Sequence, residues 1–200
     1  MPRTLVFIVL PLLLAFAASA PLFVRDAESR PDPLLVSGQQ RYDAYVRTER
    51  ESMRAMVTAG DRDGARIHRE RLRPASVAAG LSSDTPRPLQ VTRAAARVLS
   101  LDGRRTGPVD LLDVESHTAG SGVAFDAIRD ALWARDKGLV GSIDERLAGL
   151  RTELDRHRRG AGFVLASSLR VADRRRLAAA LDALAWRLEL AAEKLSASGS

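Results

Sequence analysis

The chain has no cysteine, few aromatic residues and almost no lysine. The absence of cysteine excludes disulfide bonds, thiolate metal sites, cysteine nucleophiles and the lipid-carrying cysteine of a bacterial lipoprotein. Aromatic residues make up only 4% of the chain and do not alternate with basic residues, so we expect no nucleic acid as a partner. Lys137 and Lys194 are the only lysines, and we interpret the arginine excess behind the net charge of +6 mainly as the codon bias of a GC-rich genome.

The first 20 residues have the layout of a secretory signal peptide. Arg3 precedes an uncharged apolar run over residues 5–17, and small residues follow up to Ala20. The alternative is an uncleaved membrane anchor, because about 20 helical residues can span the core of a bilayer. We therefore expect an exported protein of the periplasm or cell envelope, attached to the membrane only if this segment stays uncleaved.

One folded domain is expected after the leader. Residues 21–37 contain three prolines and several charges and are typical of a linker, and Ser37 is a plausible helix N-cap. The remaining residues, 38–198, are enough for a single domain with its own core.

The spacing of apolar residues predicts helices throughout this domain. A first helix begins near Tyr42, and Gly60 and Asp61 separate it from a second, antiparallel helix that ends at Gly80. A short helix over 91–99, a turn at 102–103 and a long helix over 109–137, ended by Gly138, follow.

Two leucine stripes give the clearest helical pattern in the chain. Leucine or isoleucine recurs every three or four residues from 139 to 154, and leucine does so again from 177 to 188 and returns two turns later at 195. No segment shows the alternation that is typical of a strand. The sequence therefore predicts an all-α fold, an antiparallel up-down helical bundle, with residues 139–157 and 173–195 as antiparallel core helices.

Several segments, taken in order and spacing, resemble one known family. They are Tyr-Asp-Ala-Tyr-Val at 42–46, Ala-Gly-Asp at 59–61, Ala-Arg-Ile-His-Arg-Glu-Arg-Leu-Arg-Pro at 65–74, Ala-Phe-Asp-Ala-Ile-Arg at 124–129, Ser-Ile-Asp-Glu-Arg-Leu at 142–147 and Gly-Phe-Val at 162–164. The chain is similar in these segments to the imelysin-like proteins, a peptidase group that includes EfeO and EfeM of ferrous-iron uptake and an alginate-binding periplasmic protein. The resemblance implies a helical, exported binding protein that holds iron or another divalent cation and works with an iron permease. The alginate-binding relative implies an anionic polymer as an alternative ligand.

The chain departs from this family where the metal should bind. The family's Gly-x-His-x-x-Glu motif is absent, and residues 81–106, where it should lie, form a much shorter stretch than in the family. A zinc-peptidase motif such as His-Glu-x-x-His is also missing. We therefore expect no enzyme, and a binding protein that is shortened and possibly degenerate in metal binding.

The remaining candidate metal ligands are His68, Glu70, Asp110 and Asp113. His68 and Glu70 lie two residues apart, so on a helix they point about 200° away from each other. Asp110 and Asp113 have helical spacing and could share a cation, although solvated charge on an amphipathic helix is the favoured interpretation. His117 is predicted to be a partly exposed helix residue rather than a ligand.

Arginines gather around the turn between the last two predicted helices. Arg158 and Arg159 precede the turn, and Arg174, Arg175 and Arg176 follow it, so an antiparallel pair brings both groups to one end of the bundle. This basic end is a candidate polyanion-binding surface. The alternative is that these arginines are solvated surface charges without a ligand. His157, between two arginines, is also expected to be solvated.

Overall fold

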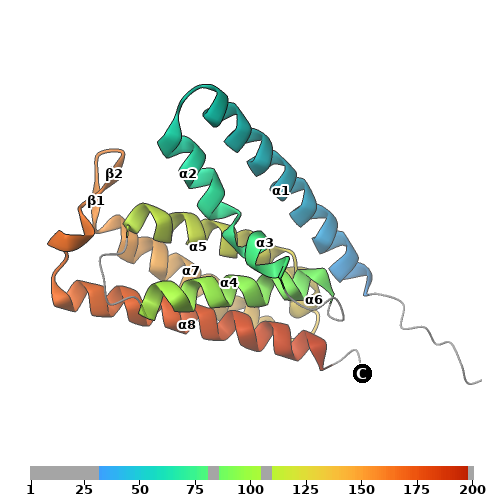
Figure 1. Ribbon diagram of the computed structural model, residues 1–200. Helices are drawn as coiled ribbons and strands as arrows, with labels where there is room; N and C mark the ends of the chain where they lie inside the picture. The colour runs from blue at the N-terminus through green and yellow to red at the C-terminus, as the bar shows by residue number, and fades with distance from the viewer. Residues whose placement is uncertain (1–31, 81–85, 105–109, 198–200) are drawn as a thin grey trace, which may run out of the picture. The chain divides into compact units, whose positions relative to one another are not determined.

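The computed structural model of the chain describes residues 32–80, 86–104 and 110–197 (Figure 1). The predicted signal peptide and residues 21–31 of the predicted linker lie outside the described residues. The described part is almost entirely helical and confirms the all-α prediction. Its α-helices are α1 Pro33–Thr58, α2 Arg62–Arg71, α3 Arg73–Ala78, α4 Arg87–Arg104, α5 Leu111–Asp126, α6 Arg129–Trp133, α7 Lys137–Asp155 and α8 Val171–Ser196.

The first helix begins earlier than predicted. Asp32, not Ser37, is the N-cap of α1, and its side chain accepts a hydrogen bond from the backbone N–H of Leu34 at 2.9 Å. Pro33 occupies the first turn, where its missing N–H costs nothing. Residues 33–37 therefore belong to the helix and not to a linker.

The predicted second helix divides into α2 and α3. Asp61 caps α2 as predicted, accepting from the N–H of Gly64 at 2.9 Å, and Gly60 before it has a φ of 77°. The helix ends at Leu72 because Pro74 cannot donate to the preceding turn, and α3 starts afresh with that proline in its first turn.

The third predicted helix, over 91–99, corresponds to α4. This helix is longer than predicted and includes residues 102–103, which were predicted to form a turn. Gly103 continues the helix because it lies against α8: a Cβ at this position would stand 3.2 Å from the carbonyl oxygen of Ala178. Asp102, predicted in a turn, is instead a buried helix residue, 6% exposed.

The predicted helix over 109–137 is interrupted twice. The first break, between α5 and α6, lies where α1 crosses: a Cβ on Gly38 would stand 1.7 Å from the carbonyl oxygen of Ala127, so the two backbones are in contact. The second break precedes α7, whose N-cap Asp136 accepts from the N–H of Leu139 at 2.8 Å. Gly138, predicted as a helix stop, lies inside α7.

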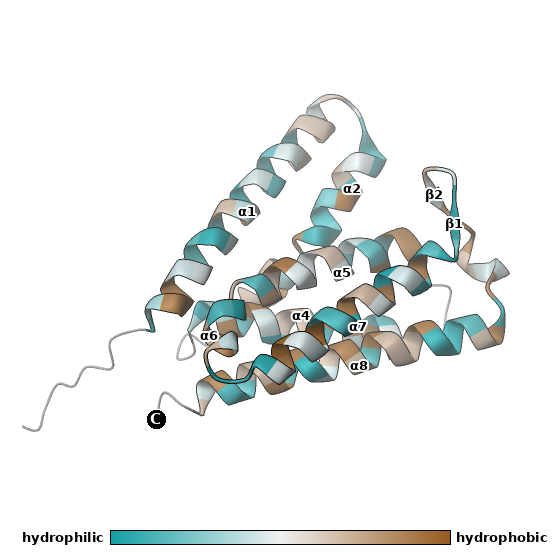
Figure 2. Cartoon of the chain, turned by 180° about the vertical axis from the view of Figure 1, so that it is seen from behind, coloured by the Kyte–Doolittle hydropathy of each residue, from teal (hydrophilic) through white to brown (hydrophobic). Residues whose placement is uncertain are grey.

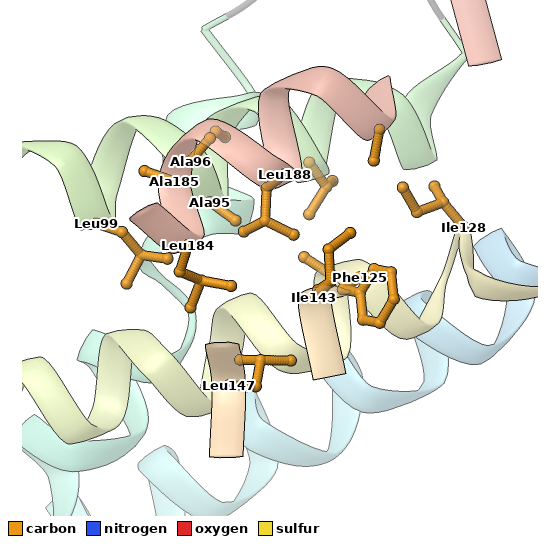
Figure 3. Packing of buried hydrophobic residues seen from close by; sticks show 14 of the residues in the cluster. Ala95, Ala96, Leu99, Phe125, Ile128, Ile143, Leu147, Leu184, Ala185 and Leu188 are labelled. Atoms are coloured by element: carbon orange, nitrogen blue, oxygen red, sulfur yellow. The ribbon is translucent and has the colours of Figure 1, made fainter. Parts of the chain in front are cut away.

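The two leucine stripes form the core as predicted. Ile143 and Leu150 of α7 and Leu184 and Leu188 of α8 are each 0% exposed. Figure 3 shows Leu184 and Leu188 facing Ile143 and Phe125 across the core. The helices run antiparallel, since Arg176 near the start of α8 contacts Glu153 near the end of α7.

A small β-hairpin lies between α7 and α8 and was not predicted. Its strands, β1 Arg158–Arg159 and β2 Gly162–Phe163, are antiparallel and too short to show an alternating pattern. Gly160 in the turn has a φ of 58°, a conformation that suits glycine.

Helices α4, α5, α7 and α8 lie alongside one another, and α1 and α2 rise from them at an angle as an antiparallel pair (Figure 1). Teal and brown residues alternate around α7 and α8 in Figure 2, in keeping with one buried and one solvated face on each of these helices. Within the described residues, no helix combines the length and the apolar content needed to cross a membrane.

Candidate functional site

A chain of charged side chains, buried at His117 and Asp102, links three helices. His117 of α5 is 1% exposed; its Nδ1 lies 2.6 Å from Oδ2 of Asp102 on α4, and its Nε2 lies 2.8 Å from Oε2 of Glu70 on α2. Arg73 donates to the same Glu70 oxygen at 3.1 Å. Carboxylates only accept hydrogen bonds, so an imidazole held by two of them carries a proton on each nitrogen.

The electrostatics agree with a charged His117. Burial alone would lower the pKa of His117, but the hydrogen bonds and negative charges of Asp102 and Glu70 outweigh it and raise that pKa above 6.5. Burial alone would raise the pKa of Glu70, but the hydrogen bonds from His117 and Arg73 lower it below 4.5. The resulting ion chain ties α2, α4 and α5 together.

His117 therefore corrects the sequence prediction of a partly exposed helix residue. Its immediate neighbours Ser116 and Thr118 are also buried, at 2% and 1% exposed. Polar residues are buried on several sides of α5, so its sequence lacks the periodic apolar stripe that normally shows which face of a helix is buried. The sequence pattern therefore could not indicate that His117 is buried. No sequence signal identified Asp102 as its partner, because that residue was assigned to a turn.

A second buried pair joins α1 and α2. His68 Nδ1 lies 2.6 Å from Oε2 of Glu49, which is 9% exposed, and Nη1 of Arg71 lies 3.6 Å from the other oxygen of the same carboxylate. His68 and Glu70 thus contact different partners on opposite sides of α2, in line with the predicted angle between them.

The structure does not bring the four predicted metal ligands together. His68 and Glu70 are engaged as described above, and Asp110 and Asp113 both bind the guanidinium of Arg66, Asp113 at 3.2 Å. Asp110 also caps α5 by accepting from the N–H of Leu112 at 2.9 Å. The three acids therefore already have cationic or backbone partners, and His68 is paired with the carboxylate of Glu49.

The candidate ligands in the described part of the chain do not fit a resident metal ion. A histidine ligand must be neutral with one free nitrogen lone pair, whereas both nitrogens of His117 contact carboxylates. Arg66 and Arg73 supply positive charge beside the nearest carboxylates, where a cation would be repelled. Within residues 32–80, 86–104 and 110–197, no group of three His, Cys, Asp or Glu side chains could hold a metal.

The predicted polyanion-binding arginines divide into two groups. Arg158 binds Glu115 and Asp155, and Arg176 binds Glu153 and Asp173, so these two are neutralised by acids of the bundle. The side chains of Arg159, Arg174 and Arg175 are exposed and make no ion pair or hydrogen bond with another described residue. We call these three the free arginine group, at the end of the α7–α8 pair.

Apolar side chains lie close to the free arginine group in the chain. Leu165 is 77% exposed and Val171 is 55% exposed, both between β2 and the first turn of α8. His157, predicted to be solvated, is instead only 13% exposed in its side chain and lies 3.8 Å from Glu153. The backbone carbonyl of His157 accepts a hydrogen bond from the N–H of Val164, just after β2, at 2.9 Å.

The chain was also compared with known proteins. No family model matches it, and no curated protein matches it either, so its similarity to the imelysin-like proteins stays a prediction from the segments quoted above.

Proposed function

We propose that the chain is an exported, non-catalytic binding protein of the cell envelope whose basic end holds an anionic polymer. The observation that supports this is the free arginine group. Arg159, Arg174 and Arg175 are exposed and without acidic partners, although acids neutralise the neighbouring Arg158 and Arg176. Unpaired guanidinium groups at one end of the molecule suit carboxylate or phosphate groups that repeat along a polymer.

A role in iron uptake, which the family resemblance implies, has weaker support. It needs a site for iron or another divalent cation, whereas the three candidate acids are paired with arginine, histidine or backbone groups and His68 is paired with Glu49. Partnership with an iron permease therefore stays a prediction from the resemblance alone.

Binding to alginate at low salt tests the proposal. The purified protein should bind, and replacing Arg159, Arg174 and Arg175 by glutamine should weaken binding strongly. Raising the salt should weaken it as well, since the Debye length falls from about 10 Å at 0.1 M to about 3 Å at 1 M.

A charge-matched control distinguishes binding at this site from a general effect of the protein's net charge. Arg47, Arg50 and Arg54 of α1 are also exposed and without described partners, and their replacement by glutamine removes the same charge elsewhere. The proposal fails if the wild-type protein does not bind at low salt, or if both triple variants lose affinity equally.

A further inference from the structure

A second basic feature lies where α2, α5, α7 and β1 meet, and no member of the free arginine group lines it. It is a cleft of about 310 Å³, near the lower limit for small-molecule sites. The polar side chains that line it are Arg71, Glu115, Thr118, Arg151, Asp155 and Arg158. We call it the arginine cleft.

One glycine of α5 makes this arrangement possible. A Cβ at Gly120 would stand 2.2 Å from the carbonyl oxygen of Arg71, so only glycine lets the end of α2 rest on α5. Arg71 at the end of α2 and Arg151 of α7 both line the resulting cleft.

The acids of the cleft satisfy only one of its three arginines. Arg158 binds Glu115, and its Nε donates to Asp155 at 3.0 Å. Arg151 is exposed and makes no ion pair or hydrogen bond with a described residue. The Nε of Arg71 is buried and has no hydrogen-bond acceptor in the described part of the chain.

Because this N–H is buried, a ligand in the cleft would reach Arg71 through its terminal guanidinium nitrogens, in a side chain that is 38% exposed. Arg71 is held from the other side, where its Nη1 lies 3.6 Å from Glu49, so its guanidinium is fixed in place. Thr118 uses its hydroxyl hydrogen on the carbonyl of Val114 at 2.7 Å. The donors left over in the cleft are therefore those of Arg71 and Arg151.

We propose that the arginine cleft binds a phosphate group between Arg71 and Arg151. Planar guanidinium groups donate pairs of parallel hydrogen bonds to tetrahedral oxyanions, which makes arginine the preferred partner of phosphate. Glu115 and Asp155 line the same cleft and disfavour a polymer with many negative charges, so a single compact dianion fits the cleft better. The site is independent of the proposed polymer binding, because no member of the free arginine group lines the cleft.

Calorimetric titration of the purified protein with inorganic phosphate at low salt tests the proposal. Arg151→Gln should weaken binding by about tenfold or more, the effect of losing a charge-assisted hydrogen bond. Arg146→Gln is the matched control, because Arg146 is an exposed arginine of the same helix without a described ion pair and lies outside the cleft. This control should leave the affinity within about twofold of the wild-type value, a surface-charge effect of a few tenths of a kcal/mol.

A parallel titration with glycerol 3-phosphate distinguishes free phosphate from a phosphate carried by a larger molecule such as a lipid headgroup. Equal or tighter binding of the ester, lost in Arg151→Gln, indicates the larger molecule, and binding of inorganic phosphate alone indicates the free ion. The proposal is overturned if neither compound binds, or if Arg151→Gln and Arg146→Gln weaken binding equally. The alginate measurement decides the polymer proposal separately.

Discussion

Replacing His117 by leucine should destabilise the protein strongly, because it leaves two carboxylates without their shared cation. Asp102 is 6% exposed and has only His117 as a described ion-pair partner, whereas Glu70 keeps Arg73. Breaking a buried ion pair by removing one partner costs about 3–5 kcal/mol. Since domains of this size are stable by only about 5–15 kcal/mol, the loss should be large enough to measure with precision.

The pH dependence gives an independent signature of the same group. The pKa of His117 is raised above 6.5 in the folded state, so its contribution to stability is fully present below pH 6.5 and is lost as the pH rises through the folded-state pKa. The free energy of unfolding of the wild-type protein should therefore decline on the alkaline side of pH 6.5. In His117→Leu that decline should be absent.

Urea unfolding followed by circular dichroism, repeated across this pH range, makes both measurements. Asp102→Asn is the companion variant: it keeps the shape of the side chain and removes one charge, so it should cost less than His117→Leu, about 1–3 kcal/mol. The reasoning is refuted if His117→Leu leaves the unfolding midpoint unchanged, or if the alkaline decline survives in that variant.

Three further predictions test the core, a close helix contact and the metal assignment. Leu184→Ala should lower the free energy of unfolding by about 2–5 kcal/mol, and an unchanged denaturant midpoint would show that this leucine is not in the core. Gly120→Ala should destabilise by crowding the carbonyl of Arg71, whereas Gly149→Ala, where no atom lies within 4 Å of the new Cβ, should stabilise α7 by up to about 1 kcal/mol; thermal melts with the same sign for both would contradict this. Calorimetric titration with ferrous, ferric or zinc ion should detect no site tighter than about 1 μM, which corresponds to about 8 kcal/mol.

The sequence was sufficient to predict the helices that form the core. In α7 and α8 one apolar stripe faces the interior and polar residues face solvent, so the 3.6-residue period of the helix is evident in the amino-acid sequence. Asp61 was also identified correctly as a cap, because a side-chain oxygen before a helix satisfies a local N–H and needs no distant partner.

Helix ends that are set by tertiary contacts could not be predicted from the sequence. The break after α5 coincides with the contact between Gly38 and the carbonyl of Ala127, and these residues lie far apart in the chain. The helical Gly103 is likewise explained by the approach of Ala178 on α8. Local propensity favours a turn at such glycines, and packing against a distant helix reverses that preference.

The contacts of the candidate ligands could not be predicted from the sequence either. The angle between His68 and Glu70 followed from helix geometry, but their partners Glu49 and His117 belong to other helices and could not be read from spacing. Among the basic residues, the sequence placed Arg158 and Arg174 at one end of the bundle. Only the structure separates Arg158, which acids neutralise, from Arg174, which they do not.

Helix α5 connects these observations, because it is enclosed by α2, α4 and α7 and has no solvated face along much of its length. A helix enclosed in this way loses its amphipathic pattern, and polar residues inside it must find partners on neighbouring helices. His117 does so through Asp102 and Glu70, while Gly120 admits the end of α2 and so sets Arg71 beside the cleft. The segment that was hardest to interpret from the sequence is therefore the one that positions both the buried ion chain and the proposed phosphate site.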